Sequence, residues 1–161
     1  MLTELLAGFE GSALAVGLRG SKWVYPLVNA GHIAGIALLF GAIAGFDLRL
    51  MSGWPRVPLE ALAQLLVPVA AAGLALAALC GSLLFIVKAT EYAASSFFQA
   101  KMAMLVLGLL NIAAYRLAAR RAGWSAADAG APPAPLQRLL GAVSFGVWLS
   151  VLVLGRLVGY F

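Results

Sequence analysis

Four long runs of apolar residues constrain this 161-residue chain more than any other feature. They cover about 23–46, 62–87, 97–117 and 136–160. Each run can cross a bilayer, since a helix needs roughly 20 apolar residues to span ~30 Å of hydrocarbon. Backbone groups in lipid must bond within their own segment, which makes such runs helical. The sequence therefore predicts an all-α fold, an integral membrane four-helix bundle that forms a single transmembrane domain.

Composition argues against a water-soluble domain and against a nucleic-acid-binding protein. Hydrophobic residues make up 63% of the chain and charged residues only 11%, whereas soluble domains carry about 25% charged residues. The net charge of +5 comes mainly from cations near the predicted helix ends, where anionic lipid head groups are suitable partners. No basic stripe with interleaved aromatic residues is present, so we expect membrane lipids as partners and no nucleic acid.

The segments outside the four runs are short. Residues 2–20 carry Glu4 and Glu10, which is unlike a signal peptide, and we predict one or two short helices lying at the membrane interface. After the first run, Asp47 and Arg49 begin a predicted polar loop.

The remaining connections are a predicted short turn over 88–96 and a predicted Ala/Pro-rich linker over 122–135. Cys80, the single cysteine, lies within an apolar run, and we expect it to be buried and inert. A lone cysteine cannot form a disulfide within the chain, so cysteine content does not indicate the redox compartment.

The distribution of cations predicts the orientation in the membrane. With the intramembrane Lys101 and Arg156 set aside, six cations lie on the side of the first and third connections and three on the other side. Loops rich in Lys and Arg face the cytoplasm. We therefore expect a multi-pass protein of the bacterial inner membrane with both termini in the periplasm.

Three ionisable residues lie inside the apolar runs: His32, Lys101 and Arg156. A charge near the bilayer centre costs at least ~2.5–3.5 kcal/mol, which makes such residues functional candidates. Counting along the helices at ~1.5 Å per residue places all three in the half of the bundle nearest the termini. This convergence predicts a site in that outer half.

The residue types in the outer half suit haem b. A neutral imidazole is a usual axial ligand of haem iron, and Lys or Arg side chains can pair with the propionates. Small residues on the same helix faces would leave room for a porphyrin. The predicted cofactor-binding residues are His32, which is also the predicted metal ligand, with Lys101, Arg156, Asn29, Gly35, Met104 and Gly108.

Simpler roles exist for the same residues. A single intramembrane histidine can form a hydrogen bond between helices, and cations near helix ends can extend to the head groups. Glycine-rich faces such as Gly31/Gly35 and Gly41/Gly45 also allow close helix packing. Only the convergence of three ionisable groups favours the cofactor.

The sequence also resembles a family of uncharacterised bacterial four-span inner-membrane proteins over nearly its whole length. The resemblance is carried by Trp23-Val24-Tyr25-Pro26, His32-Ile33-Ala34-Gly35, Gly41, Asp47-Leu48-Arg49-Leu50 and Phe97-Phe98-Gln99-Ala100-Lys101. More remotely, the chain is similar to the copper-resistance D-type membrane proteins and to the haem-b-binding J-type protoporphyrinogen IX oxidase. The latter similarity implies functional importance for His32 and Lys101. The chain departs from that group in having one histidine, and Phe97 or Phe98 where a tryptophan is common.

Three functions follow from these observations, and whether a reaction is catalysed stays open. The first is a haem-b protein acting in electron transfer or in oxidation of a porphyrin- or quinone-like substrate, alone or with a redox partner subunit. Its second axial position would be filled by Lys101, Met104, water, or His32 of a second copy in a homodimer. The alternative is a non-enzymatic subunit or anchor of a larger complex. Copper transport ranks third, because the few soft ligands form no evident path.

Overall fold

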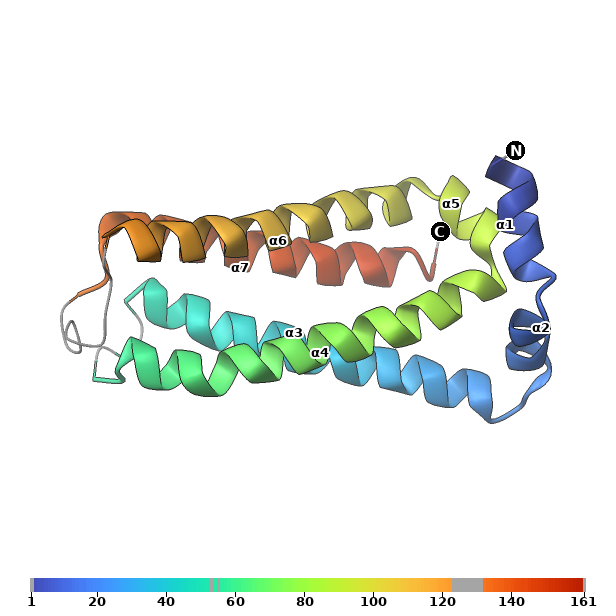
Figure 1. The fold of residues 1–161 in the computed structure, drawn as a ribbon, viewed down its shortest axis with the longest axis horizontal. Helices are drawn as coiled ribbons and strands as arrows, with labels where there is room; N and C mark the ends of the chain where they lie inside the picture. Colours follow the sequence, from blue (N-terminus) through green and yellow to red (C-terminus); the bar gives the residue numbers. More distant parts are fainter. Residues whose placement is uncertain (1, 53, 55, 123–131, 161) are drawn as a thin grey trace.

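The computed structural model describes residues 2–52, 54, 56–122 and 132–160. This part of the chain is entirely helical, which confirms the predicted all-α fold (Figure 1). The helices are α1 (Leu2–Glu10), α2 (Ala13–Gly20), α3 (Val24–Leu50), α4 (Leu59–Val87), α5 (Ala89–Ala94), α6 (Ser96–Ala122) and α7 (Pro135–Leu157).

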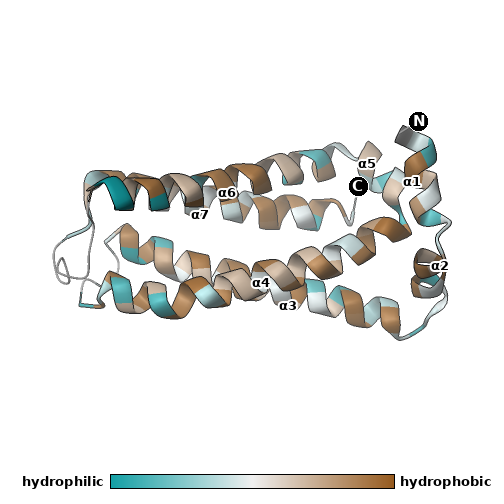
Figure 2. Cartoon of the chain, in the orientation of Figure 1, coloured by the Kyte–Doolittle hydropathy of each residue, from teal (hydrophilic) through white to brown (hydrophobic). Residues whose placement is uncertain are grey.

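Four helices, α3, α4, α6 and α7, are long and apolar enough to cross a membrane. Hydrophobic residues predominate along these helices (Figure 2), and many large ones are exposed. An even number of spans returns the chain to the side where it began, and both termini lie at the same end of the bundle (Figure 1). The protein is thus a multi-pass membrane protein.

The helices extend beyond the predicted runs. The first span continues to Leu50, so Asp47 and Arg49 are helical and buried, and the polar loop predicted to begin at Asp47 is wrong at its start. The reason is tertiary: each side chain finds a polar partner there, Ser144 for Asp47 and the Val57 carbonyl for Arg49.

Two connections also differ from the predicted ones. The predicted turn over 88–96 contains the short helix α5. At the start of the predicted linker, residue 122 belongs to α6, while most of the linker lies outside the described residues.

Helices α3 and α4 cross with their backbones in contact. A Cβ on Gly35 would lie 2.5 Å from the Ala77 nitrogen, and one on Gly73 would lie 2.5 Å from the Leu39 nitrogen. Neither position accepts a side chain without moving a backbone. Paired glycines are a common way for membrane helices to gain packing contacts.

The bundle is open on one side. Within the described residues, α3 packs against both α4 and α7, and α6 packs against α7, but α4 makes no extensive contact with α6. The four spans therefore follow the order α4–α3–α7–α6 around the bundle, and the outer helices α4 and α6 are joined near the termini by Phe85 and Phe98 but lie apart at the other end.

The N-terminal helices close the end where the termini lie. The Glu10 carboxylate on α1 accepts hydrogen bonds from the Thr90 backbone N–H at 2.8 Å and from the Thr90 hydroxyl at 2.6 Å. These bonds lower the pKa of Glu10. Phe85, Tyr92 and Phe98 stack at the same end, with ring centroids 5.4–6.4 Å apart, and join α4, α5 and α6.

Candidate functional site

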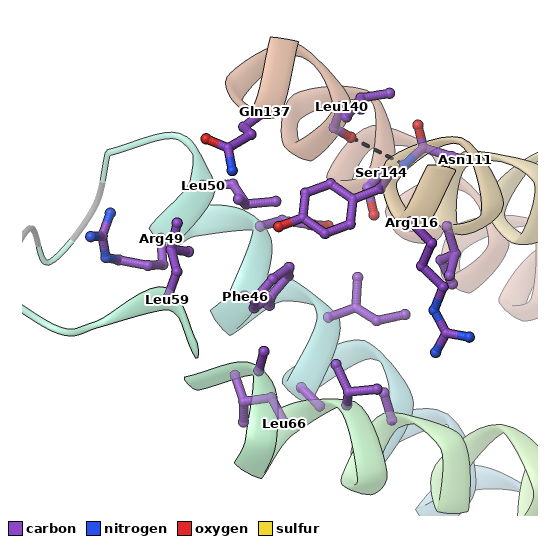
Figure 3. Close-up of a pocket in the computed structure, with 18 of the residues that line it drawn as sticks. Phe46, Arg49, Leu50, Leu59, Leu66, Asn111, Arg116, Gln137, Leu140 and Ser144 are labelled. Atoms are coloured by element: carbon purple, nitrogen blue, oxygen red, sulfur yellow. Dashed lines mark hydrogen bonds between the residues drawn. The ribbon is translucent and has the colours of Figure 1, made fainter. Parts of the chain in front are cut away.

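A cavity of about 830 Å³ that could hold a ligand lies at the end of the bundle away from the termini. All four long helices line it (Figure 3). Its volume lies within the ~300–1,000 Å³ typical of small-molecule sites. Most of the lining is apolar, and the polar side chains include Asp47, Arg49, Glu60, Asn111, Tyr115, Arg116, Gln137 and Ser144.

Asp47 is the most constrained polar residue of the cavity. Its side chain lines the cavity, although the residue is only 3% exposed. The carboxyl group is hydrogen-bonded to the side chain of Ser144 on α7. Its second oxygen, Oδ2, is buried and has no hydrogen-bond partner among the described residues. A buried polar atom without a partner costs ~1–3 kcal/mol, so this oxygen is a strong site for a donor.

Close helix packing creates the contact between Asp47 and Ser144. A Cβ on Gly141 would lie 2.9 Å from Leu50 Cβ and 3.3 Å from the Asp47 carbonyl oxygen. The lack of a side chain at Gly141 thus lets α7 approach α3. Ser144 lies three residues further along α7, on the same face as Gly141.

Further polar side chains surround this pair. Asn111 Nδ2 donates to the Leu140 carbonyl at 3.1 Å, as Figure 3 shows. Tyr115 is hydrogen-bonded to Gln137, and its ring packs edge-on against Phe46 with centroids 5.8 Å apart.

Arg116 lines the cavity from the side of α6, where it extends toward α4 (Figure 3). The remainder of the cavity is apolar and continues toward the middle of the bundle. Leu39 and Ile43 line it and also pack against the buried ring of Trp148. The cavity therefore has a polar end and an apolar end, like an amphipathic molecule.

The face of α6 that carries Lys101 and Gly108 packs against α7. A Cβ on Gly155 would lie 3.4 Å from Lys101 Nζ, and one on Gly108 would lie 2.9 Å from the Trp148 ring. Further along the same face of α6, Asn111 and Tyr115 form hydrogen bonds to Leu140 and Gln137 of α7. This face of α6 therefore forms the α6–α7 interface.

His32 lies between α3 and α4. Its Nδ1 is 2.7 Å from the Ala77 carbonyl oxygen, and its ring would lie 2.9 Å from a Cβ on Gly81. A carbonyl can only accept, so Nδ1 carries the hydrogen and Nε2 carries the lone pair. Lys101 is near enough to interact electrostatically with His32.

The other predicted cofactor residues do not gather around His32. Arg156 is exposed and donates to the Tyr160 hydroxyl on the following turn, with its guanidinium 4.6 Å from the Tyr160 ring centroid. Asn29 is exposed, and Met104 is half-buried on α6. Gly35 and Gly108, expected to leave room for a porphyrin, face the α4 backbone and Trp148. The structure thus brings His32 and Lys101 near each other and leaves no space at these two glycines.

The sequence contains little sign of this cavity. A charged residue usually ends a membrane span, so Asp47 is expected in a loop, and the predicted haem site lies in the other half of the bundle, nearest the termini. Asp47 does follow Leu39 and Ile43 at intervals of four residues, a signal that the helix continues. Its partner Ser144 carried no signal, because a serine in an apolar helix is common.

The chain matches no protein-family model, no curated protein and no solved structure with which it was compared. In the described part of the chain, no group of three or more His, Cys, Asp or Glu residues could hold a metal ion. The proposed functions below rest on the geometry of the cavity around Asp47 and of the region around His32.

Proposed function

We propose that this protein binds an elongated, lipid-soluble molecule in the cavity between its two helix pairs. The observation that carries the proposal is Asp47, which lines the polar end of an otherwise apolar cavity and whose buried Oδ2 has no hydrogen-bond partner among the described residues. A bound molecule that donates to Oδ2 removes the cost of burying it.

The gap between α4 and α6 supplies a route into the cavity. These helices lie on either side of the open face, and both line the cavity, through residues such as Leu66 and Ala70 of α4 and Ile112 of α6. An opening between membrane-spanning helices faces the acyl chains. A molecule dissolved in the bilayer would enter sideways, with no need to cross water.

Retention of a bound molecule tests this function. We would purify the protein in mild detergent and measure its mass by native mass spectrometry, alongside the variants Ala70→Phe and Ala75→Phe. Ala70 lines the cavity, whereas Ala75, on the same helix, is exposed and lies outside it. We expect a retained non-protein mass in the wild type and in Ala75→Phe, and its loss in Ala70→Phe. No retained mass, or equal retention in all three proteins, would overturn the proposal.

Haem b at His32 is a second proposed function. It is supported by the Nδ1 contact to the Ala77 carbonyl, because metal-ligating histidines usually donate their other ring N–H in this way. The imidazole therefore fits as an axial ligand, and Lys101 supplies a nearby cation. Bound haem would supply one-electron chemistry. The two packed glycines, Gly35 and Gly108, leave no slot beside them, so a porphyrin would have to lie on another side of His32.

The visible spectrum after haem-replete expression tests this second function. We expect a Soret band that is lost in His32→Ala and retained in Ile33→Ala, a change at the next residue of the same helix, whose side chain is exposed. A colourless wild type, or a band unchanged in His32→Ala, removes His32 as a ligand. The mass retained in the cavity experiment is independent of this result. If neither function is supported, the remaining candidate is a subunit or anchor of a larger complex.

A further inference from the structure

We infer that the ligand of the cavity is a neutral prenyl or alkyl lipid with a phenolic head group, a hydroquinone, whose hydroxyl donates to Asp47 Oδ2. This inference rests on the proposed function and names the class of molecule that the cavity selects. The inference concerns binding of this lipid and includes no chemical reaction.

The charges around the cavity favour a neutral head group. Its lining contains two acidic residues, Asp47 and Glu60, and two basic residues, Arg49 and Arg116, so neither sign prevails in the described part of the chain. A cationic head group would meet the arginines, and an anionic one would meet Asp47. A neutral group leaves the existing charges balanced.

Hydrogen bonding requires that the head group be a donor. In its ionised form the Asp47 carboxylate only accepts, and Ser144 already bonds to this group, which leaves Oδ2 for an external donor. Asn111 uses its Nδ2 for the Leu140 carbonyl, so its Oδ1 is a second acceptor in the lining. Two acceptors in one cavity match a head group with two hydroxyls.

Aromatic side chains favour a ring over an aliphatic alcohol. Phe46 and Tyr115 both line the cavity, as Asp47 does, and their rings pack edge-on against each other. An aromatic pair gains ~0.5–1.5 kcal/mol beyond the burial of its area, so an aromatic ring in the ligand would bind more tightly beside Phe46 and Tyr115 than an aliphatic group. Beyond the rings, the apolar part of the cavity, lined by Leu39, Ile43 and Leu74, accepts an alkyl or prenyl chain.

A matched pair of probes tests the donor. Decylubiquinol and its bis-methyl ether share ring and chain, but the ether has no hydroxyl on the ring. We would place the protein in nanodiscs, replace Trp23, Trp54 and Trp124 by Phe, and follow the fluorescence of Trp148, which packs against the cavity-lining Leu39 and Ile43. We expect the quinol to bind at least about tenfold more tightly than the ether, the difference for one hydrogen bond to a charged group.

Variants at the acceptor and at the cavity separate the inference from the proposed function. In Asp47→Asn, which retains the side-chain shape, we expect the preference for the quinol to fall below about threefold. Asn29→Leu, on the same helix but at the other end, should retain the full preference. The inferred hydroquinone head group would be contradicted if the wild type bound the quinol and the ether equally. It would also be contradicted if decanol bound as tightly as the quinol. Cavity binding as such would still stand, provided Ala70→Phe weakens every probe. Probes that bind Ala70→Phe and wild type alike would contradict both.

Discussion

Asp47 and Ser144 form a hydrogen-bonded pair that joins α3 to α7 across the interior of the bundle, with each residue at most 5% exposed. These two helices form the main contact between the α3–α4 pair and the α6–α7 pair. The pair therefore has two roles: it holds the halves of the bundle together, and it orients a cavity-lining carboxyl group whose other oxygen has no partner among the described residues.

Loss of the Ser144 hydroxyl should destabilise the protein. In Ser144→Ala both Asp47 oxygens would be buried without a partner, and we expect a loss of ~1–3 kcal/mol in the free energy of unfolding. Reversible unfolding in mixed micelles measures this quantity. Ser150→Ala is the matched control on the same helix, because the Ser150 hydroxyl donates to the Gly146 carbonyl of its own helix. Equal stability of the two variants would show that the pair contributes no net energy.

A methyl group at Gly35 should separate α3 from α4. The new Cβ would lie 2.5 Å from the Ala77 backbone nitrogen, so Gly35→Ala must move one helix. We expect a loss of ~1–3 kcal/mol, as is usual for overpacking. Gly41→Ala on the same helix meets open space and should be neutral or slightly stabilising, since Ala favours helix by up to ~1 kcal/mol over Gly. If both variants unfold alike, the backbone crossing is not tight.

The contact between Glu10 and Thr90 should depend on pH. Hydrogen bonds from Thr90 lower the pKa of Glu10, so the ionised carboxylate is the form that fastens α1 to α5. The contribution is complete above the pKa of the unfolded state and is lost as the pH falls through the lower pKa of the folded state. We expect the distance between spin labels at Ala7 and Ala94 to be short at pH 7 and to increase as the pH falls well below 4.5, the ordinary pKa of glutamate.

Glu10→Gln provides the control for this titration. An amide does not titrate, so the label distance in this variant should be independent of pH. A label distance in the wild type that stays constant down to pH 3 would contradict the proposed role of the Glu10–Thr90 hydrogen bonds in holding α1 against α5.

The direction of insertion has its own test. The excess of Arg and Lys on the side of the first and third connections predicts that the cavity end faces the cytoplasm. A reporter that is active only in the periplasm should therefore be active when fused after Tyr160, and inactive when fused after Ala122. The reverse pattern would show that the protein inserts in the opposite orientation, with the cavity end facing the periplasm.

Prediction from sequence succeeded where a property is local. Length and hydropathy of each run indicated four spans, and the burial of Cys80 within an apolar run is confirmed. Helix ends were less predictable, because Asp47 and Arg49 interrupt the hydropathy without interrupting the helix. A charged residue can continue a membrane helix when a residue far away in the chain supplies its hydrogen bonds, and such partners leave no local trace.

The sequence by itself determined that this protein consists of membrane-spanning helices, since a chain so rich in apolar residues can satisfy its backbone in lipid only in that form. It also marked His32 and Lys101 as unusual. Only the tertiary structure decided which helices touch. It packed α3 on α4 through Gly35 and Gly73, left α4 apart from α6, and enclosed Asp47 beside the resulting cavity. The physical reason is that helix packing depends on the fit of whole surfaces, whereas spanning a membrane depends on the apolar content of a single segment.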